Sequence, residues 1–141
     1  SAQQSFYRPV NRMASRLIAA ALLLPAAFIF SAQAADVGAE IVNARTHAGL
    51  AVKADNLAGV HMHLQHTINC LVGPGGDGFD PKAMNPCANS GAGAIPDTAD
   101  PTRKNLLEAA AERARAGLAA ADIATAQTDA TDTAALLAAV K

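Results

Sequence analysis

Apolar side chains recur at the spacing of an α-helix in four segments of the chain. The first segment runs from about Val37 to Lys53, and the second follows Asp55, a residue type that commonly caps a helix N-terminus. Gly73 and Pro74 end the second segment, because glycine closes a helix and proline cannot continue it. The apolar residues that share one side of the first segment are Ile41, Ala44, Ala48, Ala51 and Val52.

Two further helices are expected after a long gap. Asp100 and Pro101 supply a cap and a first-turn proline for the third, and Asp122 caps the fourth. The stretch HAGLAVKADNLA (47–58) resembles RAGLAAADIATA (115–126), which favours a duplicated hairpin, although alanine-rich helices also resemble one another by chance. With or without duplication, the pattern predicts an all-α fold, an antiparallel four-helix bundle made of two helical hairpins.

The segment between the second and third helices, residues 73–99, is rich in glycine and proline. A loop of this length in a compact domain is usually functional or tied down. Cys70 and Cys87 are the only cysteines, and an even number in an exported chain favours a disulfide. The alternative, a pair of metal thiolates, lacks the Cys-x-x-Cys spacing. We therefore expect a disulfide that tethers the loop to the end of the second helix.

The start of the chain predicts export. A short basic stretch leads into an apolar run from Leu17 to Phe30, and small residues follow up to Ala34, as at a signal peptidase site. The run is shorter than the ~20 residues that cross a bilayer, so no stable membrane anchor is expected after cleavage. The mature protein would be periplasmic or secreted. The expected layout is an upstream extension at 1–12, a signal peptide at 13–34 and one helical domain at 35–141.

Charge and composition exclude several function classes. All twelve acidic residues but only eight of the eleven basic ones follow Ala34, so the expected mature chain has a net charge of −4. Nucleic-acid binding, which needs clustered Lys and Arg, is therefore not expected. The chain is not expected to be an enzyme, because it has no recognisable Ser-His-Asp arrangement, catalytic carboxylate pair or nucleotide motif. Haem is disfavoured, because Cys-x-x-Cys-His is absent and Phe79 is the only aromatic residue after Ala34.

All four histidines lie between residues 47 and 66, on the first expected hairpin. On the second helix, His63, His66 and Cys70 fall along one flank, and His63 and His66 are close enough in sequence to face one ligand. His61 borders the core side of this helix, and Met62 lies on its outer side, one turn before His66. The core stripe beside them consists of Leu57, Val60, Leu64, Ile68 and Leu71.

The hairpin brings a further histidine to this flank. If the turn is centred near Asp55, His47 on the first helix lies level with His63 on the second. Metal sites in helical bundles are built from inward side chains on facing helices, and imidazole suits copper, nickel and zinc. The sequence therefore predicts a transition-metal ion between His47, His63 and His66.

Other residues are secondary candidates for the same ion. His61 and Met62 are close to the cluster in sequence. A carboxylate of the long loop, from Asp77 or Asp80, is a possible further ligand, because the expected disulfide pulls this loop toward the histidine flank.

The stretch THAGLAVKADNLAGVHMHLQH (46–66) resembles, in general plan, the small periplasmic metal-binding proteins that are alanine-rich four-helix bundles with histidines on helix faces. The resemblance covers the first hairpin and the bundle plan. Those proteins carry more histidines, on all of their helices, and lack this disulfide-tethered loop. The resemblance therefore implies metal binding at one or two defined sites rather than high-capacity buffering.

These observations predict a periplasmic protein that binds copper, nickel or zinc for storage, chaperoning or resistance. One alternative is a non-catalytic structural or interaction module of the envelope whose histidines anchor the long loop. Another is a pH-responsive regulator that uses the same histidine cluster.

Overall fold

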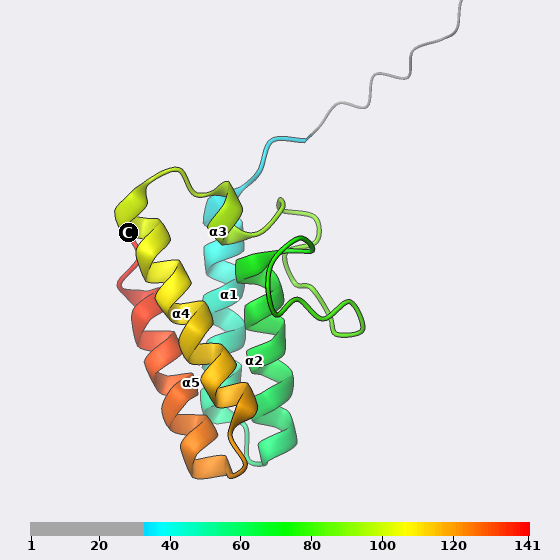
Figure 1. Ribbon diagram of the computed structural model, residues 1–141, viewed down its shortest axis with the longest axis vertical. Helices are drawn as coiled ribbons and strands as arrows, with labels where there is room; N and C mark the ends of the chain where they lie inside the picture. The colour runs from blue at the N-terminus through cyan, green and yellow to red at the C-terminus, as the bar shows by residue number, and fades with distance from the viewer. Residues whose placement is uncertain (1–32) are drawn as a thin grey trace, which may run out of the picture. The chain divides into compact units, whose positions relative to one another are not determined.

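The computed structural model describes residues 33–141 (Figure 1), so the expected extension at 1–12 and nearly all of the expected signal peptide at 13–34 lie outside the described residues. The described part of the chain is all-α, with five helices and no strand, which confirms the expected fold class. Within this part, no helix combines the length and the apolar character needed to cross a membrane. The helices are α1 (Val37–Lys53), α2 (Leu57–Val72), α3 (Ala94–Asp97), α4 (Pro101–Ala119) and α5 (Ile123–Ala138).

Polar side chains at the N-termini explain where the long helices begin. For α2 the expected cap, Asp55, is wrong: Asn56 caps this helix, and its Oδ1 accepts a hydrogen bond from the Gly59 backbone N–H at 2.8 Å. The Asp55 carboxylate instead accepts a hydrogen bond from the Asn56 side chain at 2.8 Å. The caps of α1, α4 and α5 are Asp36, Asp100 and Asp122. Each of these side chains accepts a hydrogen bond from a backbone N–H in the first turn of its helix.

The α1–α2 and α4–α5 hairpins are joined by turns of the same conformation. Ala54 ends α1 with φ −64° and ψ 139°, and Ala120 ends α4 with φ −66° and ψ 137°. The caps that follow, Asn56 and Asp122, are also alike, with φ −144° and ψ 157° against φ −131° and ψ 154°. Equivalent residues of the two hairpins are therefore 66 positions apart, whereas the sequence match of 47–58 with 115–126 pairs residues 68 positions apart.

Hydrogen bonds and burial follow this 66-residue equivalence. His61 Nε2 lies 3.0 Å from the Ala120 carbonyl oxygen, and the equivalent Gln127 donates from Nε2 to the Ala54 carbonyl at 2.8 Å. A side chain of each hairpin is thus hydrogen-bonded to the turn of the other hairpin. The equivalent pairs that are buried in both hairpins are Ile41 and Leu107, Ala44 and Ala110, Ala48 and Ala114, Ala51 and Gly117, Val60 and Ala126, Leu64 and Ala130, Thr67 and Thr133, and Leu71 and Leu137.

The four long helices lie side by side, and successive helices run in opposite directions (Figure 1). Helix α1 packs against α2 and α5, and α4 packs against α5 and α2. Small residues permit this close approach: a Cβ added to Gly117 would lie 2.7 Å from Leu64 Cδ1 and 2.9 Å from Asp129 Cβ. The core consequently combines many alanines with a few larger side chains, of which Leu64, Ile68 and Leu71 of α2 are among the largest.

The long loop between α2 and α4 is fastened to the helices at several points. The expected disulfide between Cys70 and Cys87 is present, with the two Cα atoms 5.0 Å apart. The buried Asn69 side chain accepts a hydrogen bond from the Asp80 N–H at 2.9 Å and donates to the Asp80 and Met84 carbonyls at 2.9 and 3.1 Å. The loop also contains the short helix α3, which the glycine- and proline-rich sequence did not predict.

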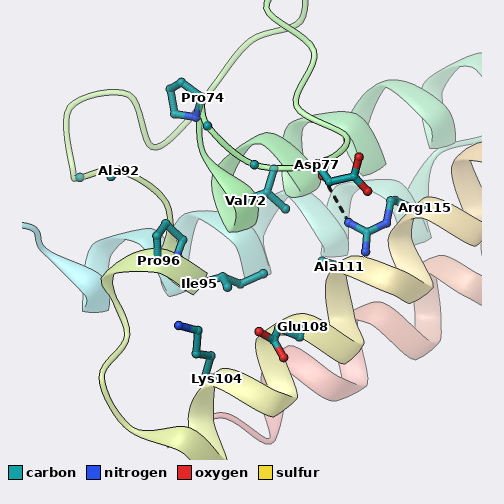
Figure 2. Close-up of a pocket in the computed structure, with 13 residues that line it drawn as sticks. Val72, Pro74, Asp77, Ala92, Ile95, Pro96, Lys104, Glu108, Ala111 and Arg115 are labelled. Atoms are coloured by element: carbon teal, nitrogen blue, oxygen red, sulfur yellow. Dashed lines mark hydrogen bonds between the residues drawn. The ribbon is translucent and has the colours of Figure 1, made fainter.

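A cavity of about 680 Å³ lies between this loop, α3 and α4 (Figure 2). Val72 and Ile95 give it an apolar wall, and Lys104 and Glu108 of α4 border it. None of the described histidines lines this cavity. It is therefore separate from the histidine flank of the α1–α2 hairpin.

A buried carboxyl group joins α1 to the end of the loop. Glu40 has no exposed surface, and its Oε1 accepts a hydrogen bond from the Gly93 N–H at 2.9 Å. Burial raises the Glu40 pKa to about 7, and the nearby Asp97 carboxyl group adds to this rise. Glu40 therefore stays protonated through a pH range in which an unfolded chain has already lost the proton.

We predict that Glu40→Gln stabilises the protein above pH 7. As the pH rises from 4.5 toward 7, the unfolded state ionises at Glu40 and the folded state does not, so the wild-type protein loses stability. The amide of the variant keeps the hydrogen bond from Gly93 and has no charge to bury, so the gain should be on the order of 3 kcal/mol at pH 8. Urea unfolding at pH 5 and pH 8 measures it, with the exposed Glu112→Gln as control. A gain equal at both pH values would contradict the prediction.

Candidate metal centre

Three histidines from two helices converge on one point of the α1–α2 hairpin. His47 comes from α1, and His63 and His66 come from α2. One ring nitrogen from each lies within 4.8 Å of those of the other two, and the ring centroids are 5.2 to 5.8 Å apart. This group, which we call the histidine triad, could hold a metal ion. The expected convergence of the three residues is confirmed.

Hairpin geometry produces the triad. The turn at residues 54–56 places His47 level with His63, because both are nearly the same number of residues from it. His66 follows His63 by three positions, so the two rings leave neighbouring positions on the same face of α2. The local sequence thus brings the three side chains together with no help from the second hairpin.

Each ring of the triad has a buried nitrogen without a partner. The Nδ1 atoms of His47, His63 and His66 are buried, and among the described residues no donor or acceptor pairs with them. Leaving a buried polar atom unpaired costs roughly 1–3 kcal/mol. Three such atoms lie in one group, and a metal ion bound there could pair with them.

The surroundings of the triad favour the neutral form of two of its imidazoles, those of His47 and His66. Burial lowers the pKa of His47 below its ordinary value of 6.5, and the neighbouring His66 and His63 lower it further. Burial, together with His63, lowers the pKa of His66 in the same direction. Since a metal ion binds only the unprotonated ring, these shifts leave His47 and His66 ready to bind at neutral pH.

The dimensions of the triad fit a transition metal. Three nitrogens at the usual ~2.0–2.1 Å from a tetrahedral zinc ion lie roughly 3.4 Å from one another. Closing the triad from at most 4.8 Å to this spacing needs only small rotations of the rings. Three imidazole donors also match the ligand preference of copper and nickel.

The second hairpin has an ion-pair network at the equivalent positions. Residues 66 positions after His47, His63 and His66 are Arg113, Asp129 and Asp132. Arg113 Nη1 lies 3.2 Å from Asp129 Oδ1, and Arg113 Nε lies 3.8 Å from Asp132 Oδ2. In the second hairpin, therefore, the protein's own side chains supply both the positive and the negative charges.

This equivalence sharpens the interpretation of the triad. In the α1–α2 hairpin the same three positions carry three imidazole rings, and no carboxylate or guanidinium belongs to the group. A cation would give them the attraction that Arg113 gives Asp129 and Asp132. Sequence reasoning missed the parallel, because the similarity of 47–58 to 115–126 suggested a register that was two residues off.

The remaining candidate ligands lie elsewhere. His61 donates from Nε2 to the Ala120 carbonyl, because a carbonyl oxygen can only accept, so this nitrogen is already used. Met62 on α2 is 49 % exposed. Asp77 lies at the cavity next to α4, where its carbonyl accepts a hydrogen bond from Arg115 at 3.4 Å (Figure 2). The Asp80 carboxylate accepts from the Lys82 N–H at 2.9 Å, and neither carboxylate belongs to the metal-sized group.

Comparison with protein-family models, with curated proteins and with solved structures gives no match for this chain. The triad is therefore interpreted from its own geometry and chemistry.

We predict that the metal-free protein loses stability as the pH falls below about 6.5. In this range the unfolded chain protonates its histidines, whereas the lowered pKa values of His47 and His66 keep those rings neutral in the folded state. Thermal unfolding with a chelator, from pH 7.5 to pH 5, measures the effect.

Two variants separate the triad from the other histidine. His47→Gln/His66→Gln should flatten this pH dependence. His61→Gln is the matched control, because Gln127 makes the equivalent hydrogen bond in the second hairpin, and it should leave the slope unchanged. An equal slope in wild type and the double variant would be inconsistent with the triad as its source.

Proposed function

We propose that the protein binds a transition-metal ion, copper, nickel or zinc, at the histidine triad, and that it serves in metal storage, chaperoning or resistance. The observation that carries this proposal is the set of three converging imidazoles whose buried Nδ1 atoms have no partner in the described part of the chain. A metal ion bound to these nitrogens would supply that partner.

We interpret the scaffold as an antiparallel four-helix bundle assembled from two hairpins. The contacts of α1 with α2 and α5, and of α4 with α5 and α2, support this interpretation. In such bundles, metal sites are formed by side chains on facing helices. The triad follows this plan with ligands from α1 and α2.

We propose the periplasm as the site of action, after cleavage near Ala34. The disulfide between Cys70 and Cys87 supports this location, because disulfides persist in oxidising compartments. The apolar run from Leu17 to Phe30 is the second argument, and it comes from the sequence.

We propose binding rather than catalysis. Among the described residues, no carboxylate or further histidine joins the triad at metal-binding distance. The metal-sized group thus contains no carboxylate that could act as a general base beside a bound ion.

The alternative function, an envelope module whose histidines anchor the loop, gains less support. In the described structure, the side chains that hold the loop are Asn69, Gln65, Asn43 and Arg115, through hydrogen bonds to loop carbonyls. The Nδ1 atoms of the triad make no such bond there. Metal binding gives these three residues a role that loop anchoring does not.

The proposal predicts that zinc, nickel or copper binds and stabilises the protein. At a free-ion concentration of about 100 times Kd, a ligand specific for the folded state adds ~2.7 kcal/mol to the free energy of unfolding. Calorimetric titration of the mature protein with Cu(II), Ni(II) and Zn(II) gives the affinity, and urea unfolding gives the stabilisation.

The matched variants are His47→Ala/His63→Ala, which should abolish both effects, and His61→Gln, which should keep them. Affinity weaker than about millimolar for all three ions, a threshold of ~4 kcal/mol in binding free energy, would refute the proposal. So would unchanged affinity in the double variant.

A further inference from the structure

We propose that the thioether of Met84 is the fourth ligand of the triad and that the site is built for Cu(I). This inference rests on the proposed function, because it assigns the class of metal that the triad binds. Met84 belongs to the long loop, which hydrogen bonds fasten to the two helices that carry the histidines.

The loop is fastened within one helical turn of the triad. Asn69 Nδ2 donates to the Met84 carbonyl at 3.1 Å, and Asn43 Nδ2 donates to the Pro86 carbonyl at 3.3 Å. Asn69 follows His66 by three residues, and Asn43 precedes His47 by four. The disulfide fixes Cys87 to Cys70, which is one turn after His66. Residues 84–87 therefore cross from α2 toward α1 beside the triad.

Side-chain direction brings this segment closer still. Side chains of an α-helix lean toward its N-terminus, so the loop atoms bound by Asn69 lie over the turn that carries His66. Met62 lies one turn before His66 on the same helix, so it is the competing thioether that the test must separate from Met84.

The burial of His66 agrees with a position of the 84–87 segment beside it. His66 is only 7 % exposed, whereas the side chain of Asp132, its equivalent in the second hairpin, is 50 % exposed. The two residues occupy the same place on their helices, and only the α1–α2 hairpin has the 84–87 segment fastened beside it. The difference in exposure is what a loop covering His66 would produce.

The Met84 side chain is free to act as this ligand. Its backbone is held by Asn69, but the side chain is 54 % exposed, one of four large apolar side chains with such exposure in the described residues. An unbranched thioether with three rotatable bonds reorients at little cost.

A thioether changes which metal the site prefers. Three imidazoles alone suit zinc, nickel and copper, but a methionine sulfur is a soft donor and selects Cu(I). Since no carboxylate of the described residues joins the group, all four donors are neutral, which suits an ion of single charge. The complete ligand set is then His47, His63, His66 and Met84.

The test compares Cu(I) and Zn(II) affinities in two matched variants. Cu(I) affinity is measured anaerobically by competition with a chromogenic Cu(I) chelator, and Zn(II) affinity by calorimetry. Met84→Leu should weaken Cu(I) binding by about tenfold or more and leave Zn(II) binding unchanged. Met62→Leu should change neither. X-ray absorption of the Cu(I)-loaded wild type should show sulfur beside nitrogen in the coordination shell, and Met84→Leu should remove that sulfur.

The outcomes separate this inference from the proposed function. If wild type binds no ion, the proposed function fails. If the triad binds Cu(I) with only nitrogen ligands, or if Met62→Leu removes the sulfur, the triad stands and the role of Met84 is overturned. Equal weakening of Cu(I) and Zn(II) by Met84→Leu would also overturn it, because a disturbed loop affects both ions.

Discussion

The length and capping of the α1–α2 turn control which side chains of the first hairpin face each other. Asn56 caps α2 through the Gly59 N–H, and the short turn that results places residue 47 level with residue 63. One residue more or less would rotate α2 by about 100° relative to this register and carry His63 away from His47. Gly59 matters for the same turn, because a Cβ there would lie 3.2 Å from Ala54 Cβ. The His61 hydrogen bond to Ala120 then links this turn to the other hairpin.

The core alone gives the fold limited support, because so much of it is alanine. Single methyl groups let helices approach closely but bury little apolar area per residue. The loop compensates through its own attachments, of which the Cys70–Cys87 disulfide and the Asn69 side chain are the most central. In the chain-entropy model, a disulfide that closes a loop of this size adds ~3 kcal/mol. Rigidity at the loop and rigidity at the triad therefore come from the same few residues.

Local patterns were sufficient to predict the long helices and the triad. Spacing of apolar residues, N-terminal caps and the Gly73–Pro74 stop are signals contained within a few residues, and the level position of His47 and His63 follows from the turn. The role of Asn69 could not be predicted, because it depends on where a loop more than ten residues away returns to the helix. The choice of Asn56 over Asp55 depended on which side chain could reach Gly59. The repeat was placed in the wrong register because identical letters, Ala-Gly-Leu-Ala, outweighed the positions of the turns.

The two hairpins form a comparison within a single molecule. They share turn conformation, burial pattern and reciprocal hydrogen bonds, but one closes its flank with Arg113 and two aspartates and the other with three imidazoles. The second hairpin carries both charges of its ion pairs within the chain, whereas the first would need a bound cation for an equivalent attraction. Amide hydrogen exchange should therefore be uneven in the metal-free protein, with α1 and the start of α2 opening more often than α4 and α5. Filling the triad would reduce the opening of α1 and α2, so a change in the difference in exchange between the two halves would report metal occupancy without any external reference.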